Sequence, residues 1–103
     1  MRSMRIIARN RLVSFWERYP ETRTSLSRWH ETTKAADWRA MDDVQRAFPK
    51  AKTLNGERVR FEVAGGGYRL VAAFDFGRQA VFVKFVGTHA EYDKIDALTV
   101  SLY

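Results

Sequence analysis

The segment Thr-His-Ala-Glu-Tyr-Asp, residues 88–93, gathers several titratable side chains just after an apolar run. His89 is one of two histidines in the chain, and it follows Gly87, where the alternating pattern of the run ends. One helical turn after this point would place Tyr92 and Asp93 beside His89. Two interpretations stay open: a solvated histidine at the end of a strand, or a group that transfers protons near neutral pH.

Arg69 interrupts an otherwise apolar run, Tyr-Arg-Leu-Val-Ala-Ala-Phe, which is typical of a central strand. A guanidinium group is costly in such a place unless it faces an open cleft or an anionic group. Either it forms a structural salt bridge with Glu62 or Asp75, or it holds a phosphate, for which its planar fork of donors is well suited. The sequence leaves both interpretations open.

The balance of charges favours an acidic or polyanionic partner. Eighteen Lys and Arg against twelve Asp and Glu give the 103-residue chain a formal charge of +6 and a pI near 10.1. The positive charge is concentrated between Lys50 and Lys84, whereas the segment after His89 is richer in acids. Basic charge alone is weak evidence for nucleic acid, because many soluble domains are basic.

Several classes of site are excluded or disfavoured. The chain has no cysteine, which excludes disulfides, thiolate catalysis and cysteine-based zinc sites. His30 and His89 are far apart and form no pair of the His-x-x-x-His type, so we expect no metal and no cofactor. Three successive glycines, residues 65–67, lack the Gly-Lys-Ser/Thr ending of a phosphate loop and lie between two expected strands, which predicts a hairpin turn.

We expect a cytoplasmic protein without membrane contact. No stretch approaches the roughly 20 apolar residues that a membrane helix needs, and the first apolar segment is too short for a signal peptide. Met4 could be the native start, with residues 1–3 as an extension.

The apolar spacing predicts a single α+β domain over residues 1–103, with a short first strand at residues 4–8 and then two to three helices. The first helix would be capped by Asn10 and ended by Pro20, the second would cover residues 22–35, and the third would be capped by Asp37 and ended by Pro49. The residues expected to be buried are Leu12, Phe15, Trp16, Tyr19, Leu26, Trp29, Thr33, Trp38, Met41, Val44 and Phe48.

After Pro49 the apolar period changes to two. Residues 57–63, 68–76 and 80–87 predict a three-stranded antiparallel meander, followed by a short C-terminal helix or tail. Because the helices come first and the strands second, we expect the helices to cover one face of the sheet.

Four segments of the chain resemble the HigB toxins of bacterial type II toxin-antitoxin modules. They are the opening Met-Arg-Ile-Ile-Ala, residues 48–63, Gly-Gly-Gly-Tyr-Arg-Leu-Val at 65–71, and Val-Phe-Val-Lys-Phe-Val-Gly-Thr-His-Ala-Glu-Tyr-Asp-Lys-Ile-Asp at 81–96. HigB toxins belong to the wider RelE/ParE superfamily. The resemblance covers nearly the whole chain from Met4 onward, and its order of elements agrees with the helices and strands expected from the residues.

The resemblance implies a small, ribosome-dependent and metal-independent endoribonuclease that cuts translated mRNA through attack of the RNA 2′-hydroxyl. It also implies a HigA-type helix-turn-helix antitoxin, which would connect the toxin to operator DNA only indirectly; a basic toxin suits an acidic partner. Glu62 stands where relatives often have Asn, which leaves its role open. The implied catalytic residues are Arg69, Lys84, His89 and Tyr92, and the implied RNA-binding residues are Lys52, Arg58 and Arg60.

We expect Arg69 and Lys84 to stabilise charge in the transition state and His89 to act as general acid or base. Tyr92 would orient His89 or stack on a base. Two other functions stay open: a ParE-like toxin that inhibits DNA gyrase without cutting RNA, and a non-catalytic RNA-binding module. The His-x-x-Tyr pattern disfavours the first, and strand aromatics that alternate like core residues disfavour the second.

Overall fold

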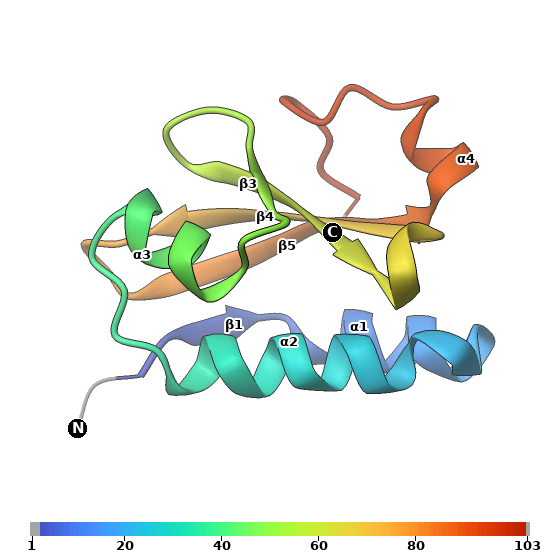
Figure 1. The fold of residues 1–103 in the computed structure, drawn as a ribbon, viewed down its shortest axis with the longest axis horizontal. Helices are drawn as coiled ribbons and strands as arrows, with labels where there is room; N and C mark the ends of the chain where they lie inside the picture. Colours follow the sequence, from blue (N-terminus) through green and yellow to red (C-terminus); the bar gives the residue numbers. More distant parts are fainter. Residues whose placement is uncertain (1–2, 103) are drawn as a thin grey trace.

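A five-stranded mixed sheet in the order β1-β5-β4-β3-β2 forms the centre of the structure, a computed structural model that describes residues 3–102 (Figure 1). The elements are β1 (Arg5–Ile7), α1 (Arg9–Arg18), the 3-10 turn η1 (Pro20–Thr22), α2 (Arg23–Ala35), α3 (Met41–Ala47), β2 (Lys52–Thr53), β3 (Arg58–Val63), the 3-10 turn η2 (Ala64–Gly66), β4 (Tyr68–Asp75), β5 (Ala80–Thr88) and α4 (His89–Tyr92). Met1 and Arg2, which belong to the expected N-terminal extension, lie outside the described residues.

The predicted α+β class and the antiparallel meander β3-β4-β5 are confirmed. Two edge strands complete the sheet: β1 pairs parallel with β5, and β2 pairs antiparallel with β3. The predicted glycine turn is also confirmed, because Gly65 and Gly66 have φ angles of 74° and 100°, values that L side chains rarely adopt.

Helices α1 and α2 lie side by side across one face of the sheet, which we call the helix face (Figure 1). Leu12 of α1 and Leu26, Trp29 and Thr33 of α2 turn their side chains into this interface, as their helical spacing predicts. Burying one such leucine contributes roughly 1.5–3 kcal/mol. The strands supply the other wall of the core through Val59, Phe61, Val63, Leu70, Ala72, Phe74, Val81, Val83 and Val86.

Of the three tryptophans, Trp29 and Trp38 are buried as expected. Trp16 is only partly buried, and the guanidinium carbon of Arg9 lies 5.6 Å from the centre of its ring. Among residues 3–102, no helix has both the length and the apolar character that crossing a bilayer requires.

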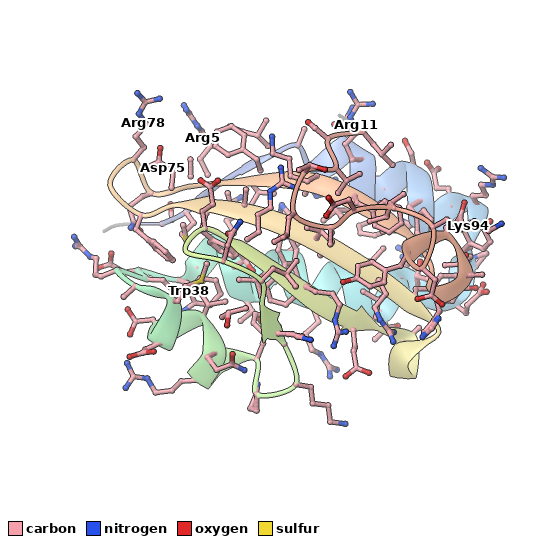
Figure 2. All side chains as sticks on the ribbon, turned by 90° about the horizontal axis from the view of Figure 1, so that it is seen from above. Arg5, Arg11, Trp38, Asp75, Arg78 and Lys94 are labelled. Atoms are coloured by element: carbon pink, nitrogen blue, oxygen red, sulfur yellow. The ribbon has the colours of Figure 1, made fainter. Side chains whose placement is uncertain are left out.

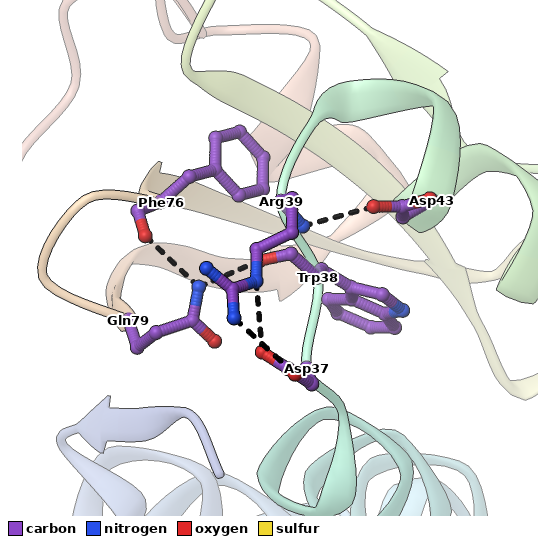
Figure 3. A network of polar contacts seen from close by, with 6 residues as sticks. All are labelled: Asp37, Trp38, Arg39, Asp43, Phe76 and Gln79. Carbon is purple, nitrogen blue, oxygen red and sulfur yellow. Dashed lines mark hydrogen bonds and ion pairs between the residues drawn. The ribbon is translucent and has the colours of Figure 1, made fainter. Parts of the chain in front are cut away.

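Two predicted helix caps are wrong. Helix α1 begins at Arg9 after Ala8, so Asn10 lies inside its first turn, and α3 begins at Met41 after Ala40. Neither N-cap residue makes a side-chain cap. At α3 the backbone amide of Arg39 instead donates to Oδ2 of Asp43 at 2.9 Å, because an acidic residue in the first turn can reach back to the preceding chain (Figure 3).

The loop before α3 is fastened to the hairpin between β4 and β5 (Figure 3). Nε2 of Gln79 donates to the carbonyl of Trp38 at 2.6 Å and to that of Phe76 at 2.9 Å. Asp37, expected to be a cap, pairs with Arg39, with Oδ1 and Nε 3.1 Å apart. This network closes the end of the sheet that lies away from η2.

Tyr68, the first residue of β4, ties the opposite end of the sheet to the helices. Its ring centre lies 5.9 Å from that of Phe15 and 5.5 Å from that of Tyr19, and its hydroxyl donates to the carboxylate of Glu21. This hydrogen bond favours the ionised carboxylate, so it lowers the pKa of Glu21, and it raises the pKa of Tyr68 to about 12.

We predict that Tyr68→Phe raises the pKa of Glu21 toward the ordinary value of 4.5, because the donor that stabilises the charged form is lost. A carboxyl whose pKa is depressed by folding stabilises the fold above its unfolded pKa, and this contribution disappears as the pH falls through the folded pKa. The stability difference between wild type and variant should therefore shrink below pH 4.5. A carboxyl-detected NMR titration of Glu21 measures the shift, and equal pKa values in both proteins would contradict the prediction.

Candidate functional site

The face of the sheet opposite α1 and α2, here called the far face, carries a first row made of Glu62, Arg69 and Gly87. The strand register places Glu62 opposite Arg69 and Arg69 opposite Gly87. Leu70, which follows Arg69, and Val86, which precedes Gly87, belong to the core. Because side chains alternate along a strand, the first row points away from the helices. Arg69 thus lies between a carboxylate and a residue without a side chain.

A second row contains Lys52, Arg60, Val71 and Phe85. Arg60 is a diagonal neighbour of Arg69, which in a sheet corresponds to about 7–8 Å between α-carbons. Tyr92 of α4 lies over this row: its ring centre is 6.0 Å from the guanidinium carbon of Arg60 and 6.2 Å from the ring centre of Phe85. The second row therefore brings two predicted RNA-binding residues and one predicted catalytic residue together.

The third row, Arg58, Ala73 and Phe82, lies farther from η2. Lys84 occupies a bulge, because Val71 pairs with Phe85 while Ala72 pairs with Val83, and its Nζ lies 5.5 Å from the centre of the Phe82 ring. Arg58 precedes the first-row residue of its strand by four residues and Lys84 by three, which correspond to about 13 and about 10 Å. The structure does not group these two predicted site residues with Arg69.

His89 begins α4 at the first-row end of the sheet. Its backbone amide donates to the carbonyl of Gly67 at 2.9 Å, which fixes the start of the helix beside η2. Thr88 and Glu91 form a capping box, with hydrogen bonds of 2.8 and 3.1 Å. This four-residue helix therefore has its own cap and one backbone hydrogen bond to the turn before β4.

The imidazole of His89 has an orienting partner. Its Nδ1 lies 3.0 Å from Oδ2 of Asp93, and 52% of the His89 side chain is exposed. A carboxylate beside Nδ1 favours the tautomer that carries its proton on that nitrogen, in which Nε2 is the acceptor. An accessible imidazole beside a carboxylate is suited to proton transfer.

Gly87 permits the close approach of α4 to the sheet. A β-carbon at this position would lie 2.6 Å from Cζ of Phe85 and 3.1 Å from Oε1 of Glu91. The Phe85 ring and the capping-box carboxylate therefore use the space that any other residue would fill. Because Phe85 also contacts Tyr92, Gly87 helps to set the position of the Tyr92 ring over the second row.

The guanidinium of Arg69 is buried, with 9% of the residue's surface exposed, and it donates to the backbone carbonyls of Gly66 and Tyr68. Within residues 3–102 it pairs with neither Glu62 nor Asp75, the two partners considered from the sequence. Asp75 instead lies 3.8 Å from Arg78 in the hairpin, at the opposite end of the molecule from Lys94 and α4 (Figure 2).

Arg69 and Arg60 both retain donors without acceptors. The Nε atoms of the two side chains are buried, and neither has a hydrogen-bond partner. A buried donor without an acceptor is unfavourable. Positively charged side chains that lie close together also attract an anion. The far face therefore carries two guanidinium groups with unused hydrogen-bonding capacity, whose Nε atoms are closed to solvent in this structure.

A groove of about 610 Å³ lies between α2 and the edge of β3, and it shares Glu62 with the first row. Its charged lining is balanced, since Arg28 and Lys50 face Glu21 and Glu62, and it contains no histidine. Its volume therefore does not make it a better candidate for chemistry than the far face.

Two contributors to the site were not identified from the sequence: the capping box and the close approach at Gly87. The expected position of Asp93 beside His89 is confirmed, with 3.0 Å between Oδ2 and Nδ1. The capping box has a readable signal, because Thr88-x-x-Glu91 is the usual pattern of such a box. The approach of Phe85 to Gly87 depends on a side-chain direction that residue types do not specify.

Comparison with known proteins supplies a family. A family model described as HigB_toxin, RelE-like toxic component of a toxin-antitoxin system, matches residues 22–95. The mRNA interferase HigB of Escherichia coli O6:H1 is 27% identical over 94 residues, which cover 89% of this chain and 91% of that protein. The mRNA interferase toxin HigB of Escherichia coli K12 is 30% identical over 98 residues, which cover 92% of this chain and 93% of that protein.

We predict that Gly87→Ala destabilises the protein by about 1–3 kcal/mol, the usual cost of overpacking, because the added methyl group must displace Phe85 or Glu91. Gly56→Ala is the matched control, since a β-carbon there meets nothing within 4 Å. Urea denaturation of both variants measures the difference. Equal midpoints for the two variants would show that α4 is not packed tightly on Gly87.

Proposed function

Because the chain belongs to the HigB family of RelE-like toxins of toxin-antitoxin systems, we propose that it is an endoribonuclease that cleaves mRNA during translation. The relatives are named mRNA interferases. The observation that carries the proposal is the placement of unpaired guanidinium donors and an oriented, exposed imidazole at one end of one sheet face.

Arg69 and Arg60 would hold the scissile phosphodiester. Both have a buried Nε that lacks an acceptor, and guanidinium groups bind phosphate oxygens through two parallel hydrogen bonds. A donor aimed at the developing charge of a transition state contributes about 2.7–4 kcal/mol in other enzymes. Lys52, beside Arg60, and Lys84, beside Phe82, would extend the contact along the RNA backbone.

His89 would remove the proton from the RNA 2′-hydroxyl through Nε2, while Asp93 holds Nδ1. The 2′-oxygen then attacks phosphorus, the bond from phosphorus to the 5′-oxygen of the next nucleotide breaks, and water protonates the departing oxygen. The products are a 2′,3′-cyclic phosphate and a 5′-hydroxyl, so the nucleophile comes from the RNA itself. Tyr92, packed between Phe85 and Arg60, would stack on a base, because Asp93 already orients the imidazole.

The cellular partners would be mRNA on the ribosome and an acidic antitoxin of the HigA type. Electrostatic complementarity favours such an antitoxin for a chain of net charge +6. The antitoxin, as a helix-turn-helix protein, would provide the only connection to operator DNA. This account favours a nuclease over a gyrase inhibitor, because an exposed imidazole beside a carboxylate suits proton transfer, which a gyrase inhibitor does not perform.

We predict that Arg69→Ala and His89→Gln each reduce cleavage of a defined mRNA on programmed ribosomes by about 100-fold or more, since each removes a phosphate donor or the proton-transfer group. Primer extension across the message measures the cleavage. Arg78→Ala is the matched control for the lost positive charge, because Arg78 is exposed in the distant hairpin, and it should cut normally. Normal cutting by both site variants would overturn the site assignment.

A further inference from the structure

The far face is covered where strand alternation alone would leave it open to solvent. Val71, Ala73 and Phe85 point away from the helices and are nevertheless buried. Helix α4 and residues 93–102, which we call the C-terminal strap, lie on this side of the sheet (Figure 1). The backbone amide of Leu102 donates to the carbonyl of Lys84 at 3.0 Å, so the strap reaches β5.

The strap contains a turn whose carbonyl groups converge on one arginine. The amides of Thr99 and Val100 donate to the carbonyl of Asp96 at 3.1 and 2.9 Å, and the amide of Leu98 donates to Oδ1 of Asp96 at 3.0 Å. Carbonyl oxygens late in such a turn have no donor within it and carry partial negative charge. A cationic side chain placed opposite these carbonyl groups supplies the missing donors and balances their partial negative charge.

Arg58 is that cation. Its Nη1 donates to the carbonyl of Ala97 at 3.0 Å and to that of Val100 at 2.7 Å, across 39 and 42 residues of sequence. Only 9% of Arg58 is exposed, and within residues 3–102 no carboxylate pairs with it. Hydrogen bonds from a charged donor are stronger than those between neutral groups, so this contact is a strong attachment for the strap.

We propose that Arg58 is a positioning residue that ties the C-terminal strap across the far face and thereby holds α4, rather than a direct contact to RNA. The connection to the site is short, because the strap follows α4 without a break. The amides of Lys94 and Ile95 donate to the carbonyls of Glu91 and Tyr92 at 3.1 and 3.3 Å. A loosened strap would let α4, and with it His89, move away from the first row. The catalytic consequence rests on the proposed function, whereas the attachment itself does not.

The attachment is tested by hydrogen exchange of the full-length protein. Arg58→Met keeps most of the side-chain length and removes both hydrogen bonds, so the Leu102 amide should exchange about 10- to 100-fold faster, as expected for losing bonds to a charged donor. Arg60→Met, the control, removes the same charge two residues away and should leave this amide protected. Unchanged exchange in Arg58→Met would overturn the proposal, whatever the protein does to RNA.

The route to catalysis is tested by a double-mutant cycle. Asp96→Ala loosens the turn that carries both acceptor carbonyls, so it should lower kcat for mRNA cleavage as Arg58→Met does, and the double variant should be no worse than the poorer single one. Arg58→Lys, which keeps a charged donor, should restore part of the activity. Losses that multiply in the double variant would mean that Arg58 contacts RNA directly and that the positioning role is wrong.

Discussion

The register of β3, β4 and β5 is the constraint from which the rest of the structure follows. Side chains alternate along a strand, so a slip of one residue would turn Arg60 and Arg69 into the core and expose Phe61 and Leu70. The apolar residues that pack under α1 and α2 prevent that slip. The same alternation that builds the core therefore decides which face receives the positive charges and which side chains share a row.

The three far-face arginines occupy three different environments although they share one face of the sheet. Arg58 is satisfied by strap carbonyls, Arg60 lies under Tyr92, and Arg69 folds over the η2 turn. Burying a charge is unfavourable unless polar groups surround it, and at Arg58 the chain itself supplies them. At Arg60 and Arg69 the buried Nε has no acceptor, so the proposed function assigns the phosphate to those two and not to Arg58.

Local patterns were enough to predict the helices, the meander and most of the core, because amphipathic spacing is a property of short segments. They were not enough to identify the parallel pairing of β1 with β5, since a three-residue strand finds its partner through contacts distant in sequence. The expected caps Asn10 and Asp37 were wrong because both helices begin without a side-chain cap. The position of Tyr92 over Arg60, and of Arg60 diagonally beside Arg69, depends on the register of three strands, which residue types alone do not fix. The carbonyl partners of Arg58 lie too far along the chain to be inferred.

The central claim is that Arg69 and His89 reach one phosphodiester. The most direct measurement is a cryo-EM structure of the protein on a ribosome whose mRNA carries a 2′-O-methyl group at the nucleotide to be cut, which prevents the attack. We expect the guanidinium of Arg69 on the non-bridging oxygens of that phosphate and Nε2 of His89 next to the blocked 2′-oxygen. An mRNA that runs along the helix face, or a phosphate that contacts one of these groups while the other stays remote, would contradict the account.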